Sequence, residues 1–266
     1  MSSDQTVCKR FQKLIDTLLE SPEITSEGSA DFIAACVANS VSQQDSFSPQ
    51  CIHIPRGIKS VYPKNRKQAA LIDSIYANHI TFGLGPAGTG KTYIAIALAL
   101  KLLLSHKMRK LILTRPVVEA GESLGFLPGD LVQKINPYLR PLFDIMETLL
   151  PADVLRSMEE SNTIEVAPLA YMRGRTLHNA VVILDEGQNT TKEQMKMFLT
   201  RMGEGSKLII TGDPSQSDIR GKSESGLVHA ASLIRAIEGI GIIEFSANEV
   251  VRHSLVQKII HAYESQ

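Results

Sequence analysis

The chain has 266 residues, of which 28 are basic and 28 are acidic, so its formal net charge is zero and no global field draws it to nucleic acid or to an acidic membrane. Its three cysteines are far apart and lack histidines at zinc-ligand spacing, which excludes a common zinc site and indicates reduced thiols. The most apolar stretch, residues 94–104, contains Lys101 and is too short to span a bilayer, and the first residues lack a leader pattern, so we expect a cytoplasmic protein without membrane contact.

Residues 1–55 are predicted to form a helical segment followed by a linker. Five apolar residues lie at helical spacing ahead of a Ser-Pro stop, namely Phe11, Leu14, Ile15, Leu18 and Leu19. A second short helix is expected at 31–40, and the polar, aperiodic residues 41–49 are typical of a linker. This segment contains no motif that carries chemistry. Its apolar helix face predicts packing against the main domain, with docking of another protein as the alternative.

From residue 80 onward, short β-branched runs alternate with helical stretches, as in βαβ units. The runs are 80–84, 111–114, 163–166, 181–184, 208–211 and 242–245. Their nearly unbroken apolar character is typical of parallel strands covered on both faces. Between residues 130 and 151, Pro137 and Pro141 are expected to break a helical pattern into short pieces. We therefore predict an α/β fold with a mostly parallel sheet and helices on both faces.

The octet GPAGTGKT at 85–92 has the form GxxxxGK[ST], directly after a strand-like run and directly before a helical run. Backbone N–H groups of such a loop curl around the β-phosphate, Lys91 reaches the β- and γ-phosphates, and the Thr92 hydroxyl ligates Mg2+. The predicted cofactors are therefore ATP and Mg2+. The predicted nucleotide-binding residues are Gly85, Pro86, Ala87, Gly88, Thr89, Gly90, Lys91 and Thr92.

Two further apolar runs end in polar residues suited to phosphoryl transfer. Asp185 and Glu186 follow the run at 181–184; Asp185 is expected to hold Mg2+ through water, and Glu186 to polarise the attacking water as general base. Asp213 and Gln216 follow the run at 208–211. Because ligands lie outside the carboxyl ends of strands in open α/β sheets, either is a candidate γ-phosphate sensor. A plain Gly-Asp-Pro turn is the alternative.

Six blocks in order resemble the PhoH family, whose ATPase domain is similar to the first RecA-like domain of superfamily 1 helicases. The blocks are GPAGTGKT, LTRPVVEAGESLGFLPGD, YMRGRTL, VVILDEGQNTT, TRMGEGSKLIITGDPSQSD and VVRHSLVQKIIHAYE. The resemblance covers about residues 61–264 and implies a RecA-like P-loop ATPase domain at 56–266. In those helicases the DE-x-Q and GD-x-x-Q blocks are hydrolysis motifs. This implies catalytic roles for Asp185, Glu186, Gln188, Asp213 and Gln216.

Gln68 lies in a block similar to the glutamine block of those helicases, in which a glutamine holds the adenine edge. An amide offers adenine both a donor and an acceptor, whereas guanine presents the opposite pattern, so a preference for ATP over GTP is implied. An ordinary place on a helix surface is the alternative for Gln68.

Fast hydrolysis usually needs a cation near the γ-phosphate. The helicases that the chain resembles supply it from a second RecA-like domain, for which this chain is too short. We therefore expect a neighbouring subunit to donate an arginine within a homo-oligomer such as a hexameric ring. Arg252 and Arg201 are the candidates, and a surface salt bridge is the alternative for each.

Nucleic acid, with RNA ahead of DNA, is the partner that the resemblance favours. Arg115, at a strand end where related helicases touch a phosphate backbone, Arg173 and Arg175, and the basic residues at 59–67 are candidate contacts, while solvated charge is the ordinary alternative. The leading hypothesis is an ATPase coupled to RNA or single-stranded nucleic acid. The alternative is a slow ATP-dependent switch or scaffold that recruits a protein partner. A small-molecule kinase is expected to lack the DE-x-Q and GD-x-x-Q blocks.

Overall fold

The computed structural model describes residues 12, 15, 33, 36, 37, 51–116, 131–218, 225–251, 255, 256 and 259, and of residues 131–137 it describes the backbone alone. Most of the two expected N-terminal helices and the whole linker at 41–49 lie outside these residues. The five described residues before position 51 have helical conformation. The division of the chain at residue 55 stays a prediction.

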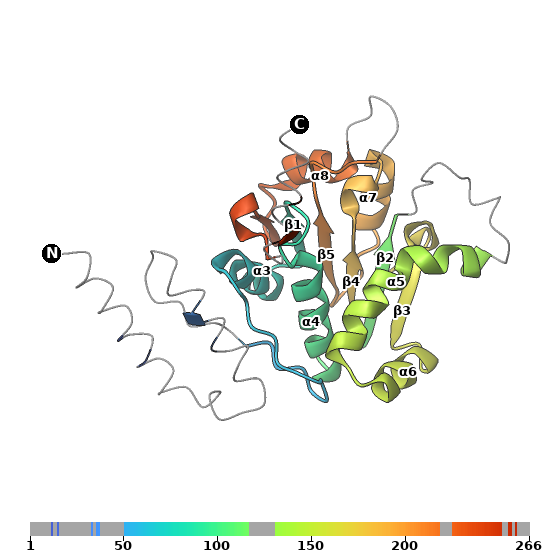
Figure 1. Cartoon of the computed structure of the whole chain (residues 1–266). Helices are drawn as coiled ribbons and strands as arrows, with labels where there is room; N and C mark the ends of the chain where they lie inside the picture. Colours follow the sequence, from blue (N-terminus) through green and yellow to red (C-terminus); the bar gives the residue numbers. More distant parts are fainter. Residues whose placement is uncertain are drawn as a thin grey trace.

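A parallel sheet forms the centre of the described fold, with six strands in the described ranges (Figure 1). The strands are β1 (Ile80–Leu84), β2 (Lys110–Arg115), β3 (Ile164–Pro168), β4 (Ala180–Leu184), β5 (Lys207–Gly212) and β6 (Ile240–Glu244). Their order is β3-β2-β4-β5-β1-β6, and every neighbouring pair is parallel. β5 lies between β1 and β4, so the strands that precede the three predicted motifs are neighbours and end at one edge of the sheet.

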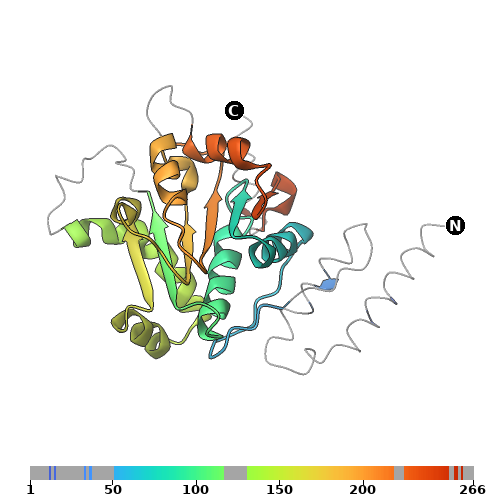
Figure 2. The ribbon, with the colours of Figure 1, turned by 180° about the vertical axis from the view of Figure 1, so that it is seen from behind.

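Helices cover both faces of the sheet, as Figures 1 and 2 show from opposite sides. One core cluster joins the sheet to α3 (Arg66–Ala77), α4 (Lys91–Leu104), α5 (Leu131–Leu149) and α6 (Ala152–Glu160). A second cluster joins the other face to α7 (Lys192–Leu199), α8 (Gly226–Ile234) and the 3-10 turn η3 (Leu169–Met172). The predicted α/β fold, with a parallel sheet and helices on both faces, is thereby confirmed in the described ranges. No helix of these ranges has the length and apolarity needed to cross a membrane.

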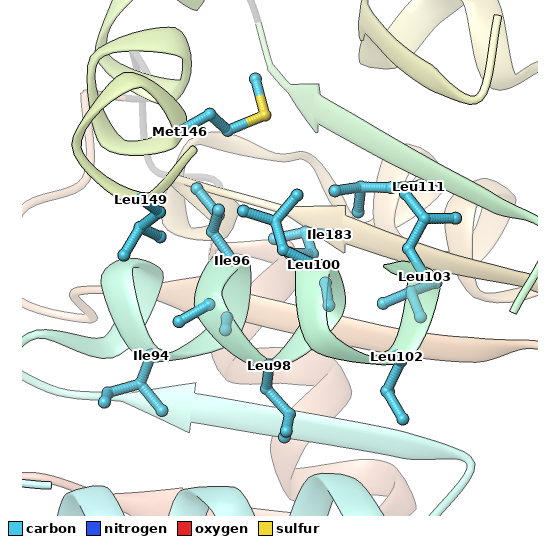
Figure 3. Packing of buried hydrophobic residues seen from close by; sticks show 14 of the residues in the cluster. Ile94, Ile96, Leu98, Leu100, Leu102, Leu103, Leu111, Met146, Leu149 and Ile183 are labelled. Carbon is cyan, nitrogen blue, oxygen red and sulfur yellow. The ribbon is translucent and has the colours of Figure 1, made fainter. Parts of the chain in front are cut away.

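α4 is buried on nearly all sides, which explains why its sequence is apolar all round. Ile96 and Leu100 face α5 and the sheet, whereas Ile94, Leu98 and Leu102 point the other way (Figure 3). Each fully buried leucine or isoleucine contributes about 1.5–3 kcal/mol relative to an exposed one. The helix that follows the predicted phosphate loop is therefore fixed firmly against the sheet.

The prediction that prolines break the segment at 130–151 is wrong, because α5 is one helix from Leu131 to Leu149. Pro137 and Pro141 each remove one amide donor and crowd the preceding turn. Leu142, Met146 and Leu149 of the same helix are at most 1% exposed and join the core cluster that contains α4. This burial offsets the lost hydrogen bonds and keeps the helix continuous.

Candidate nucleotide-binding site

The loop between β1 and α4 has the backbone shape that phosphate binding requires. Gly85 has φ 136° and Gly90, the N-cap of α4, has φ 79°, and both values lie in the left-handed region that favours glycine. A Cβ on Gly85 would lie 2.4 Å from the carbonyl oxygen of Phe245. Larger residues are therefore excluded from these two positions. The loop leads directly into the amino end of α4, where backbone amides and the helix dipole attract anions.

Lys91 is buried at 7% exposure, and its ammonium group is enclosed by the loop. Nζ donates to the carbonyl oxygens of Gly85 at 2.6 Å and Pro86 at 2.7 Å, and to the Thr89 hydroxyl at 3.1 Å. It also lies 6.0 Å from the centre of the Phe245 ring. The positive charge is therefore fixed within the loop that is expected to receive the phosphates.

Thr92 and Asp185 meet at the carboxyl edge of the sheet, although they are 93 positions apart in the sequence. Asp185 Oδ1 accepts hydrogen bonds from Thr92 Oγ1 at 2.7 Å and from Thr211 Oγ1 at 2.8 Å. Burial raises the pKa of the Asp185 carboxyl, and the nearby Arg115 guanidinium opposes that rise. Hydroxyl and carboxylate oxygens are the ligand types that Mg2+ prefers.

The acidic and imidazole side chains of the described ranges form no group of three that would hold a metal by protein ligands alone. Mg2+ sites in phosphoryl-transfer proteins commonly use one or two protein oxygens, with substrate phosphates and water completing the shell. Thr92 and Asp185 fit that pattern.

Glu186 is fixed by its backbone and by both carboxylate oxygens. It has φ 55° and ψ 39°, an unfavourable conformation for a residue with a Cβ, where it begins the 3-10 turn η4 (Gly187–Asn189). Oε1 lies 2.7 Å from Arg115 Nη2, and Oε2 accepts from Gln188 Nε2 at 2.5 Å. Gln188 Oε1 in turn accepts the Asp213 N–H at 3.0 Å. Gln188 thus connects the carboxylate after β4 to the loop after β5.

The two polar residues after β5 differ in their surroundings. Asp213 is 6% exposed; its Oδ2 accepts the Ala87 N–H of the phosphate loop at 3.1 Å, and its Oδ1 accepts the N–H and O–H of Ser215 at 3.0 and 2.6 Å. Gln216 is exposed, and its backbone N–H donates to the Asp213 carbonyl oxygen. Asp213 therefore supports the shape of the loop. The sequence did not reveal this contact, because its two residues are 126 positions apart.

Gln68 is buried against the phosphate loop at 3% exposure, so its interpretation as a helix-surface residue is excluded. Nε2 donates to the Thr89 carbonyl oxygen at 2.9 Å, and Oε1 accepts the Lys64 N–H at 2.7 Å. An amide nitrogen has two hydrogens and an amide oxygen two lone pairs, so each end keeps one further hydrogen-bonding position. Adenine recognition by Gln68 stays a prediction.

The segment after β6 borders the same loop, which the sequence did not indicate. The Phe245 N–H donates to the Leu84 carbonyl oxygen at 2.7 Å, and the Val251 N–H donates to the Gly88 carbonyl oxygen at 2.8 Å. Arg252, the next residue in the chain, lies outside the described residues. Its role as a donated arginine stays a prediction.

Arg201 lies ahead of the amino end of β5, whereas the phosphate loop lies at the carboxyl edge of the sheet. Its guanidinium donates to the carbonyl oxygens of Met197 and Arg175 at 3.0 Å each and to the Thr200 hydroxyl at 3.1 Å. These bonds give Arg201 a local structural function. Donation of this arginine to a neighbouring subunit is an untested prediction.

Two of the arginines expected to contact nucleic acid are paired with carboxylates. Arg115 contacts Glu186 at 2.7 Å and Asp185 at 3.4 Å. Arg175 makes two bonds to Glu165, at 2.6 and 2.9 Å, and with Lys110 it lowers the pKa of Glu165 to about 2. In contrast, Arg173 and the basic side chains of Lys59, Lys64, Arg66 and Lys67 are exposed.

Comparison with known proteins gives one family-model match, described as PhoH-like protein, over residues 60–264. The chain is 55% identical over 208 residues to a PhoH-like protein of Bacillus subtilis (strain 168), covering 78% of this chain and 65% of that protein. It is 53% identical over 205 residues to a PhoH-like protein of Mycobacterium tuberculosis (strain ATCC 25618 / H37Rv), with coverages of 77% and 58%. Identity to Protein PhoH of Escherichia coli (strain K12) is 42% over 210 residues, with coverages of 78% and 59%. The matched region thus spans less than two thirds of the length of these relatives.

Among solved structures, the chain is similar to the crystal structure of Pif1 helicase from Candida albicans. The TM-score is 0.39 at 14% sequence identity, and the match covers 74% of this chain and 42% of that one. A likeness this distant carries no functional argument.

Proposed function

This chain belongs to the PhoH-like protein family, and from that premise we propose that it hydrolyses ATP with the help of Mg2+. The observation that carries the proposal is the contact of 2.7 Å between Thr92 Oγ1 and Asp185 Oδ1. It brings the first turn of the phosphate-loop helix to the strand end that also presents Glu186. The residues proposed to bind the phosphates, to hold the cation and to act as base therefore lie at one edge of the sheet.

Each part of the site has a defined task in the proposed reaction. The loop amides and Lys91 bind the β- and γ-phosphates, while Thr92 and Asp185 would hold Mg2+, which would neutralise phosphate charge. Glu186 orients a water molecule and accepts its proton as the water oxygen bonds to the γ-phosphorus. The bond from that phosphorus to the β–γ bridging oxygen breaks, and ADP and phosphate result. Gln188 positions Glu186, and Gln68 is the proposed adenine contact.

Steady-state phosphate release tests this proposal. Glu186→Gln removes the base but keeps the shape of the side chain, so we expect turnover to fall at least ~100-fold with ATP affinity retained. Glu193→Gln, an exposed acid on α7, is the matched control and should turn over like the parent protein. Undiminished hydrolysis in Glu186→Gln would refute the assigned base. ATP binding with negligible turnover in the parent protein would favour the slow switch or scaffold instead.

We also propose that the active form is a homo-oligomer with an arginine supplied between subunits. The support is chemical: the transition state needs a cation near the γ-phosphate, and an arginine from a neighbouring subunit would supply it. Val251, next to Arg252 in the chain, contacts the phosphate loop of its own subunit, so action within one subunit is the competing arrangement. Mixing Lys91→Ala with Arg252→Ala subunits separates the two. Restored activity in the mixture supports donation between subunits, and an inactive mixture refutes it for Arg252.

RNA is the nucleic acid that we propose as partner. The exposed basic residues Lys64, Arg66 and Lys67 lie at the start of α3, beside Gln68, so they would place a phosphate backbone near the nucleotide site. Phosphate release measured with and without polyuridylic acid tests this. Stimulation that disappears in Lys64→Ala/Lys67→Ala supports the proposal, and an RNA-independent rate in the parent protein refutes coupling.

A further inference from the structure

Arg115 lies at the carboxyl end of β2, between the acidic pair and α5. Its side chain is 18% exposed. Nη2 lies 2.7 Å from Glu186 Oε1, and Nη1 donates to the Tyr138 carbonyl oxygen of α5 at 3.0 Å. A guanidinium group is planar and rigid, so these two contacts are not independent. One side chain therefore links the carboxylate proposed as base to the backbone of a helix that begins later in the chain.

Glu186 is restrained in this arrangement at both of its oxygens. Arg115 contacts Oε1 and Gln188 contacts Oε2, while the backbone has the left-handed φ of 55°. A carboxylate that acts as general base must direct an oxygen at the proton of the water. Hydrogen bonds between charged partners are roughly twice as strong as neutral ones. The contact with Arg115 therefore opposes the movement that catalysis requires.

The other end of the link is the Tyr138 carbonyl oxygen of α5, which lies one residue after Pro137, the residue whose carbonyl oxygen loses its helical donor at Pro141. Pro141 lies in the turn that follows Tyr138 and has no N–H group to offer. The Arg115 guanidinium supplies an additional donor to this part of the helix. The orientation of the guanidinium plane is thus set by α5 as well as by Glu186.

We propose that Arg115 is a positioning residue that restrains Glu186 by tying it to α5, so that a displacement of α5 releases the base and accelerates turnover. This inference rests on the proposed ATP hydrolysis and adds a control element to the same site. A direct role for Arg115 as the cation of the transition state predicts the opposite result. In that case its removal would slow hydrolysis by ~10³-fold or more.

The test is the turnover of Arg115→Met, which keeps the length of the side chain and removes both links. Phosphate release is measured at saturating Mg2+, because Arg115 also lies 3.4 Å from Asp185. We expect kcat to rise about tenfold, with the KM for ATP nearly unchanged. Arg175→Met is the matched control, since Arg175 is also a partly exposed arginine that pairs with a glutamate, at 2.6 Å. Its kcat should equal that of the parent protein.

Two further variants complete the test. Arg115→Met/Glu186→Gln should be as inactive as Glu186→Gln, because the additional turnover must pass through Glu186. Arg115→Lys keeps a positive charge that can pair with Glu186. An ammonium group lacks the planar, forked shape with which the guanidinium also reaches the Tyr138 carbonyl oxygen of α5, so the kcat of this variant should also rise. This variant carries the test if Arg115→Met fails to fold, which thermal unfolding reveals.

The outcomes separate this inference from the proposed function. A lower or unchanged kcat in Arg115→Met overturns the restraint, and a rate equal to the parent's in Arg115→Lys overturns the part played by α5. If Glu186→Gln hydrolyses ATP at the parent rate, it is the proposed catalytic base that fails. A higher kcat in both Arg115 variants that requires Glu186 supports the restraint.

Discussion

Replacing Glu165 with glutamine should destabilise the protein in a way that depends on pH. Glu165 is on β3, where it makes two bonds to Arg175 and one to Lys110 at 2.7 Å. These cations lower its pKa from 4.5 to about 2. A shift of about 2.5 units corresponds to ~3.4 kcal/mol at ~1.36 kcal/mol per unit, before screening. Because the cations are each 32% exposed, we expect ~1–2 kcal/mol in practice.

The sign of the pH effect follows from the lowered pKa. The pairing stabilises the folded state fully above the unfolded pKa of about 4.5, and the stabilisation is lost as the pH falls toward 2. Roughly two fifths of it should remain at pH 3. The difference in unfolding free energy between the parent protein and Glu165→Gln should therefore be constant from pH 6 to 8 and narrow below pH 4.5.

Urea unfolding at pH 7, 5 and 3 measures this difference. Glu244→Gln is the matched control, because Glu244 also pairs with an arginine, Arg235, but both side chains are more than half exposed. Glu244→Gln should lower the free energy of unfolding by at most ~0.5 kcal/mol at pH 7. The reasoning would be refuted if both variants lost the same unfolding free energy at pH 7. It would also be refuted if the loss in Glu165→Gln did not become smaller as the pH falls. If Glu165→Gln lowers the free energy of unfolding by the expected amount, the ion pair of Glu165 with Arg175 stabilises the fold. Arg175 then has a structural role.

Three further variants test the nucleotide site. Lys91→Ala should weaken ATP binding at least ~100-fold by calorimetry, because it removes a charge-assisted phosphate contact, and unchanged affinity would disprove the loop's assignment. Asp213→Asn should weaken ATP binding about tenfold by disturbing the Ala87 N–H contact, whereas exposed Asp218→Asn should not, and equal affinities would contradict the supporting role. Gln68→Ala should reduce the preference for ATP over GTP; equal weakening of both nucleotides would show a structural role only.

The sequence by itself predicted the six strands to within two residues at either end, and the phosphate loop with its two partner strands. These features depend on local chemistry. Apolar runs identify buried strands, and the glycines of GPAGTGKT specify a backbone that few other sequences adopt. The meeting of Thr92 with Asp185 was also foreseeable, because parallel strands that carry successive motifs end at one edge of the sheet.

Tertiary structure decided how the polar side chains pair at that edge. Asp213 contacts Ala87, Val251 contacts Gly88, and Arg115 contacts Glu186, and no spacing rule links the members of these pairs. α5 remained one helix through two prolines because its packing against α4 outweighs what the prolines cost locally. Local sequence encodes hydrogen bonds and periodicity over a few residues. A carboxylate or guanidinium takes the partner that the folded chain brings within about 3 Å, and this choice is made when the sheet, α4 and α5 assemble.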